Sequence, residues 1–203
     1  PGELEPPSIT DAYAAQEELR KLWEPLHGKV GGLKIAVTTK IMQELMGIDH
    51  PCGGMIYERD VHHAPATIDK SRFLHMVVEC ELAVRLGKDL PATGKPYDRR
   101  SVRSAIAAVM PAFELIEDRN AVYKECKAYS LIADNAWNGG VVLGPQTPLD
   151  PALELDGLPG RLFIDGKLAH QGKTDDPLGA LAWVANLAVE RGRPMTAGMI
   201  SIT

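Results

Sequence analysis

Two glutamates one residue apart, Glu79 and Glu81, lie in a run of β-branched and apolar residues at positions 77–84, which predicts a strand. Alternate side chains of a strand share a face, so both carboxylates point the same way. Because two carboxylates on one face repel each other, either water screens them or a cation neutralises them. Two interpretations are open. The pair marks the wet face of an amphipathic strand, or a site for a hard divalent cation, which prefers carboxylate oxygens.

Size and composition limit the class of protein. The chain has 203 residues and a formal net charge of -5, which suits one domain, or one domain with an appended arm. No basic patch indicates nucleic-acid binding, and no apolar run is long enough to predict a membrane span. The three cysteines are odd in number and widely spaced, without zinc-site spacing, which favours a reducing compartment such as the cytoplasm.

Helices and strands are expected in an irregular order. Helical spacing of apolar residues predicts a helix over 11–23, capped by Ser8 or Thr10 and ended by Pro25 and Gly28. Further helices are expected up to residue 46 and over 101–109, 126–135 and 178–191. Strands are expected over 33–37, 55–57, 67–69, 77–84, 111–119, 141–144 and 198–203, with an Asp-Gly hairpin over 161–169. The absence of regular β-α-β alternation favours an α+β fold. We find no glycine-rich phosphate loop and no nucleophile elbow.

Ten stretches in the same order carry a family resemblance. The chain resembles the 2-keto-4-pentenoate hydratase and 4-oxalocrotonate decarboxylase group of the fumarylacetoacetate hydrolase superfamily. The matching stretches are 32–40 with Met42 and Gln43, 47–51, 79–83, 87–90, 111–116, 133–136, 142–144, 176–178, 182–186 and 197–198. The resemblance implies a mixed β-roll or sandwich with flanking helices, as in the C-terminal domain of fumarylacetoacetate hydrolase. Residues 1–30 would form an N-terminal helical arm and residues 31–203 the catalytic domain, and family chains continue beyond Thr203 with strands that close the sheet.

The resemblance implies a metal centre and a reaction. Glu79, Glu81 and Glu114 match the family's ligands of a divalent cation, Mg²⁺ or Mn²⁺. The implied substrate is a 2-oxo acid, whose developing enolate charge the metal would stabilise. We expect a hydratase (a lyase) that acts on a 2-hydroxypenta-2,4-dienoate-like acid in the breakdown of aromatic compounds. Decarboxylation, carbon–carbon hydrolysis and a catalytically impaired partner subunit are the alternatives.

Two basic residues match positions near the family's chemistry. Lys34 falls on the active-site lysine and would donate a hydrogen bond or a proton to the substrate, whereas a solvated lysine on a strand edge is the alternative. Arg119 would pair with a substrate carboxylate, or else form a structural ion pair with a neighbouring acid. Weaker candidates are Glu117, Asp118, Asp134 and Asn135.

The chain departs from the family pattern beside the chemistry. Cys52 stands where the hydratases have an acid thought to transfer protons, so we take Cys52, with Lys34 and Arg119, as a candidate catalytic residue. A thiol with a pKa of about 8.5 is a poor base unless it is strongly perturbed. Asp49 or His50 would replace it only in a rearranged loop. Trp137 stands where the family usually has a small residue. The family also implies a homo-oligomer and, in some pathways, a complex with a second pathway enzyme.

Overall fold

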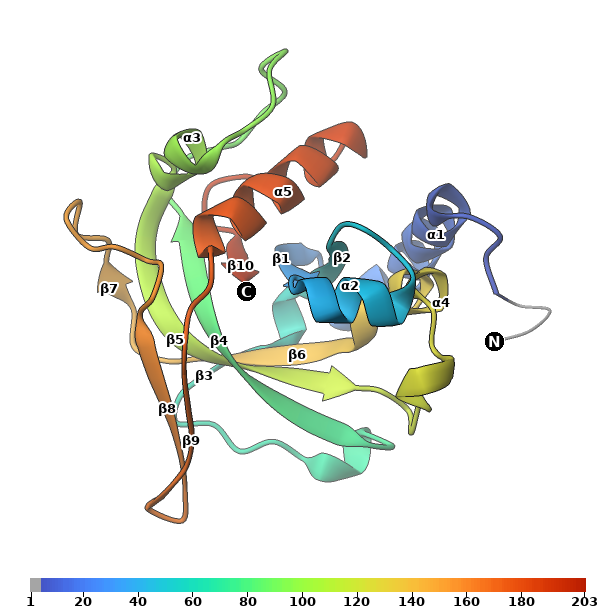
Figure 1. Ribbon diagram of the computed structural model, residues 1–203, viewed down its shortest axis with the longest axis horizontal. Helices are drawn as coiled ribbons and strands as arrows, with labels where there is room; N and C mark the ends of the chain where they lie inside the picture. The colour runs from blue at the N-terminus through green and yellow to red at the C-terminus, as the bar shows by residue number, and fades with distance from the viewer. Residues whose placement is uncertain (1–4) are drawn as a thin grey trace.

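A computed structural model describes residues 5–203 of the chain. Its main sheet has eight strands in the order β2-β1-β10-β4-β5-β6-β3, with β7 paired to β5 outside this path. The sheet is strongly curled, and helices flank it (Figure 1). The strands are β1 (Val30–Ala36), β2 (Cys52–Tyr57), β3 (Val61–His63), β4 (Met76–Leu86), β5 (Ile106–Glu117), β6 (Asn138–Leu143), β7 (Thr147–Pro148) and β10 (Ile200–Ile202).

Strands β4 and β5 form the spine of the sheet. They pair antiparallel over nearly their whole length, from Met76 opposite Glu117 to Leu86 opposite Ile106. Strand β10 pairs antiparallel with β4 and parallel with β1, so it connects the spine to the β1–β2 pair. This arrangement places β1 between β2 and β10, and the central residues Gly32, Lys34 and Ile35 of β1 are buried.

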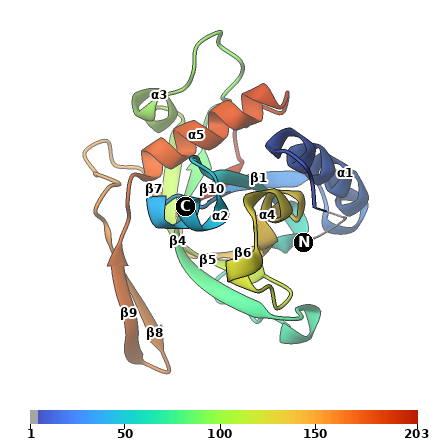
Figure 2. The same ribbon diagram turned by 45° about the vertical axis from the view of Figure 1, so that its right-hand side comes forward.

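Helices cover the sheet at two places (Figures 1 and 2). Helix α5 (Pro177–Glu190) packs an apolar face on residues of β1, β4 and β5, including Ile35, Val84 and Val109. Helices α1 (Ile9–His27) and α4 (Ala128–Ala133) contact each other around a second apolar cluster that includes Tyr13. The remaining α-helices are α2 (Lys40–Met46) and α3 (Arg99–Arg103). None of the described helices has the length and apolar character needed to cross a membrane.

A separate hairpin, β8 (Pro159–Ile164) and β9 (Lys167–Lys173), projects from the body of the molecule (Figures 1 and 2). Asp165 and Gly166 at its tip have φ angles of 50° and 75°, as a type I′ turn requires, so the predicted Asp-Gly hairpin is confirmed. A mostly apolar hollow of about 980 Å³ lies between this hairpin and the spine. Apolar side chains at the tip are more than half exposed, namely Phe163, Ile164 and Leu168.

Three predicted elements differ from the structure. The helix expected over 101–109 is only α3, capped by Asp98, because residues from Ile106 onward pair with β4 as part of β5. The strand expected at 67–69 is absent from the described residues, and β3 lies earlier in the chain, where it pairs with β6. Helix α1 continues past Pro25 to a cap at Gly28, whose backbone N–H donates to the carbonyl of Glu24.

Candidate metal centre

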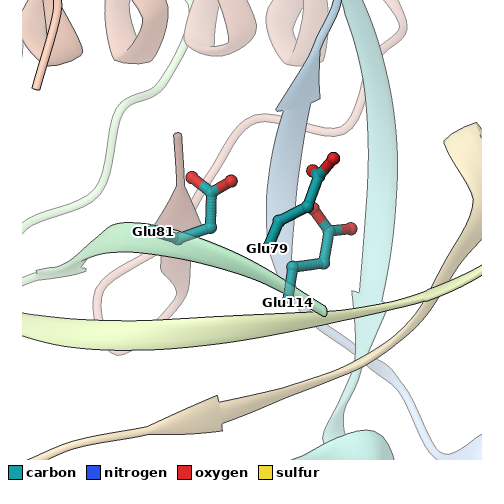
Figure 3. A group of neighbouring side chains, drawn as sticks. All are labelled: Glu79, Glu81 and Glu114. Atoms are coloured by element: carbon teal, nitrogen blue, oxygen red, sulfur yellow. The ribbon is translucent and has the colours of Figure 1, made fainter. Parts of the chain in front are cut away.

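Three carboxylates meet where β4 and β5 pair. Glu79 lies directly opposite Glu114 in the strand register, and Glu81 is two residues further along the same face of β4. Each of the three side chains offers an oxygen, and these oxygens all lie within 4.8 Å of one another. Figure 3 shows the three side chains projecting from the same side of the two ribbons. A divalent cation such as Mg²⁺ is bound by oxygen ligands of this kind, so the residues present fit such an ion.

Burial increases across the cluster. Glu79 is exposed, Glu81 is half-buried, and Glu114 is only 1% exposed. Burial, together with the charges of Glu114 and Glu79, raises the pKa of Glu81 to about 8. Burial also raises the pKa of Glu114, against the opposing effects of Lys34 and Asn138. The three carboxylates lie close together in a site that is closed at Glu114 and open to solvent at Glu79. A bound cation would offset the repulsion among their negative charges.

Lys34 lies at the closed end. Its side chain is 3% exposed, its Nζ atom is 2.9 Å from Oε1 of Glu114, and it donates to the carbonyl of Ala136 at 3.1 Å. The interpretation of Lys34 as a solvated strand-edge lysine is wrong, because β1 is an inner strand. Gly54, its partner on β2, leaves the necessary space: a Cβ at Gly54 would lie 2.9 Å from Cγ of Lys34 and 2.7 Å from the carbonyl oxygen of Asn135.

An unusual turn closes this end of the site. Asn135, Ala136 and Trp137 all have left-handed backbones, with φ angles of 54°, 49° and 58°. The Asn135 side chain holds the turn against β2, since it accepts from the Met55 N–H at 2.7 Å and donates to the Met55 carbonyl at 2.8 Å. The turn thereby aims the Ala136 carbonyl at Lys34.

The residue after this turn, Asn138, was not foreseen from the sequence. It donates from Nδ2 to Oε1 of Glu114 at 2.7 Å and is 6% exposed. The signal available was an amide side chain at the start of a glycine-rich, otherwise apolar strand. Trp137 packs edge-on against Tyr123, with ring centroids 5.3 Å apart.

Arg119 is engaged with another acid. Its guanidinium pairs with the carboxylate of Asp134, and the two side chains are 40% and 34% exposed. This contact is the structural ion pair that stood as the alternative to substrate binding. Arg119 itself has a left-handed backbone at φ 51°, two residues after the end of β5.

The acids that precede Arg119 cap loops. Asp118 is 2% exposed, lies 2.7 Å from Nδ1 of His75, and accepts from the Tyr123 hydroxyl at 3.0 Å. Its burial alone would raise the pKa of Asp118, but these hydrogen bonds outweigh burial and lower it. Glu117 accepts from the backbone N–H groups of Leu74, His75 and Arg119. Both side chains thus fix the chain ends of the spine beside Glu79 and Glu114.

Cys52 lies in the apolar cluster beneath α1 and α4. It is 0% exposed, and burial raises the pKa of its thiol to about 12. Such a thiol is protonated at neutral pH and enclosed by apolar neighbours. In the loop before it, His50 contacts the carbonyl of Pro51 through Nδ1 at 2.7 Å and stacks on Trp183.

Comparison with known proteins finds relatives that align with almost the whole chain. No family model matches. The chain is 31% identical over 208 residues to 2-oxo-hept-4-ene-1,7-dioate hydratase of Escherichia coli, covering 97% of this chain and 77% of the relative. It is 31% identical over 201 residues to 2-keto-4-pentenoate hydratase of Paraburkholderia xenovorans LB400, covering 97% of this chain and 73% of the relative. Among solved structures, 4-oxalocrotonate decarboxylase from Pseudomonas putida G7, complexed with magnesium and adipate, superposes with a TM-score of 0.87 at 27% identity, covering 97% of this chain and 75% of that one.

Proposed function

The chain belongs to the 2-keto-4-pentenoate hydratase group of the fumarylacetoacetate hydrolase superfamily, and on this basis we propose that it is a divalent-metal-dependent hydratase. Its proposed substrate is 2-hydroxypenta-2,4-dienoate or a related 2-oxo acid formed in the breakdown of aromatic compounds. The observation that carries the proposal is the cluster of Glu79, Glu81 and Glu114 with Lys34 in contact with the most buried carboxylate.

We assign the metal to the three carboxylates, with Mg²⁺ or Mn²⁺ as the ion. The magnesium in the solved decarboxylase supports a divalent cation. When bound, such a cation supplies Lewis-acid chemistry that stabilises negative charge on the keto oxygen of a 2-oxo acid. The open end at Glu79 leaves room for the substrate to approach, and the closed end at Glu114 excludes water.

Lys34 is the residue that we assign to proton handling. Its Nζ atom carries protons at the closed end of the site, held in place by Glu114 and the Ala136 carbonyl. From this position it would donate a hydrogen bond to the substrate and deliver a proton to the carbon that must be protonated during hydration. We assign Cys52 a packing role and Arg119 a structural one, because the first is enclosed in the core and the second is occupied by Asp134.

The test is a turnover assay with freshly generated 2-hydroxypenta-2,4-dienoate. We expect loss of the dienoate absorbance in the presence of Mg²⁺, abolition by a chelator, and recovery when Mg²⁺ is restored in excess. Glu79→Gln should lose metal binding and turnover together. Turnover that persists in the metal-free protein would contradict the proposal.

Decarboxylation is the second candidate, because the solved relative with a TM-score of 0.87 is a decarboxylase. The two reactions differ in product: a dicarboxylic 2-oxo acid would release CO₂ in one case and gain water in the other. Carbon–carbon hydrolysis would instead yield two smaller acids. A chain that binds the metal but gives none of these products would be a partner subunit.

We also propose a cytoplasmic homo-oligomer. Three free cysteines support a reducing compartment, and the exposed apolar side chains at the β8–β9 tip support burial against another copy. Light scattering after size-exclusion chromatography would give the mass of the particle, and a monomer at micromolar concentration would contradict the oligomer.

A further inference from the structure

One oxygen of the most buried carboxylate is held by two donors. Oε1 of Glu114 is 2.9 Å from Nζ of Lys34 and accepts from Nδ2 of Asn138 at 2.7 Å. We propose that Asn138 is a positioning residue of the metal centre, which fixes Oε1 of Glu114 and thereby turns the other oxygen toward the space shared with Glu79 and Glu81. This inference rests on the metal-binding part of the proposed function.

The local backbone supports a dedicated role for Asn138. The left-handed turn before it ends at Trp137, and β6 begins at Asn138, which lies opposite Ile116 where the β5–β6 register is irregular. The two glycines after it let β6 lie close to the backbone of Leu115 and Asp60. A Cβ at Gly139 would lie 3.1 Å from the Leu115 carbonyl oxygen, and one at Gly140 would lie 2.8 Å from the Asp60 carbonyl oxygen. The amide of Asn138 is thus delivered to Glu114 by backbone that other residues could not easily form.

Both donors to Glu114 depend on this same short segment. Ala136 anchors the ammonium of Lys34, and Asn138 supplies the amide. The two contacts differ in kind, because Lys34 contributes charge whereas Asn138 contributes direction without charge. Loss of the amide would leave Oε1 of Glu114 held by Lys34 alone, so the charge would stay balanced while the orientation of the carboxylate would be less tightly fixed. Residues that orient metal ligands in this way typically contribute about 10- to 100-fold to metal affinity.

The experiment is a calorimetric titration of the whole chain with Mn²⁺ at constant pH. It compares the wild type with Asn138→Ala, Asn138→Gln and a control, Asn186→Ala. The side chain of Asn186 makes two hydrogen bonds, both with the backbone of Tyr97, and lies on α5, which carries none of the three carboxylates. We expect about 10- to 100-fold weaker Mn²⁺ binding for Asn138→Ala. We expect partial recovery for Asn138→Gln, which keeps an amide donor, and wild-type affinity for Asn186→Ala.

The outcomes separate this inference from the proposed function. Failure of the wild type to bind Mn²⁺ would overturn both. Normal binding by the wild type and by Asn138→Ala would overturn the positioning role alone. If Asn138→Ala does not fold, as judged by circular dichroism, Asn138→Ser replaces it, since a hydroxyl is too short to reach as the amide does. Undiminished affinity in Asn138→Ser would then contradict the inference.

Discussion

Two acid–base pairs lie a short distance apart along β5 and its continuation, and their surroundings differ completely. In the Lys34–Glu114 pair the side chains are 3% and 2% exposed, whereas in the Arg119–Asp134 pair they are 40% and 34% exposed. All four residues are candidates in the sequence. The difference shows that enclosure, rather than residue type, sets how strongly the two charges of a pair interact, because charges interact weakly in water and strongly where water is excluded.

The position of each basic residue in the sheet explains the contrast. Lys34 projects from β1, which has a hydrogen-bonded strand on each side, and Gly54 makes room for it. Arg119 comes after the last residue of β5, where the chain turns away from the sheet. A charge pair at a strand end is solvated, and its loss is easily compensated. A charge pair between inner strands has no replacement for either partner.

The largest effect is expected from Glu114→Gln. It leaves the buried ammonium of Lys34 without a countercharge and removes a metal ligand. We expect the free energy of unfolding to fall by about 3–5 kcal/mol, with loss of measurable metal binding and turnover. Urea unfolding and metal titration would measure both. Asp134→Asn is the matched control in the exposed pair, and equal destabilisation by the two substitutions would erase the contrast between the pairs.

Lys34→Met separates the two roles of the Lys34–Glu114 pair, which are proton donation and metal binding. The apolar stem is retained while the ammonium is lost, so the proton donor disappears but all three carboxylates remain. We expect turnover to fall by about 10²- to 10⁴-fold, while Mn²⁺ binding persists because a repelling positive charge has been removed. Steady-state kinetics and calorimetry on the same preparation would show this. A parallel loss of metal affinity would mean that Lys34 organises the ligands instead.

The carboxylate cluster should also make stability depend on pH. The pKa of Glu81 is raised to about 8 in the folded chain, so between about pH 5 and 8 the folded metal-free state binds more protons than the unfolded state. Its stability should therefore decrease as the pH rises through this window, and saturating Mg²⁺ should offset the decrease. Thermal unfolding between pH 5 and 9, with and without Mg²⁺, would measure it. Glu81→Gln should flatten the metal-free profile, and an unchanged slope would contradict the assignment to Glu81.

The smallest effect is expected from Arg119→Ala. Loss of an exposed ion pair costs about 0–1 kcal/mol of stability, and KM should stay near the wild-type value if Asp134, rather than substrate, occupies the guanidinium. Kinetics with a mono- and a dicarboxylic substrate would check this. A large increase in KM for either acid would indicate that Arg119 binds substrate, and both basic residues would then have a role at the site.

Part of the metal centre can be predicted from the sequence by simple strand geometry. Strand alternation places Glu79 and Glu81 on one face without any knowledge of the fold. Glu114 lies in a separate strand, and its register opposite Glu79 is a tertiary property, so only the family resemblance brought it into the set. The α+β class followed from the irregular order of elements, together with that resemblance. The sequence predicts a helix over residues 106–109, because local propensity does not reveal that β4 pairs with them.

Other features could not be predicted, since they depend on irregular backbone. The burial of Lys34 can be predicted only if it is known that β10, far along the chain, pairs with β1. The contact of Asn138 with Glu114 depends on three consecutive left-handed residues, a conformation for which Ala136 and Trp137 carry no sequence signal. Cys52 is buried because α1 and α4 pack over it, which is a tertiary property. Its match to the family's acid position in the sequence therefore does not reveal whether its side chain is exposed or buried.

Gly54 shows how far the demands of the site extend beyond its reactive groups. It has no side chain, yet even a methyl group there would meet Lys34, Ala136 and the backbone of Asn135 at once. In a random mutagenesis library selected for loss of activity, substitutions at Gly54 should be recovered alongside those at Glu114. A map of mutational tolerance would therefore mark as essential a residue that has no side chain.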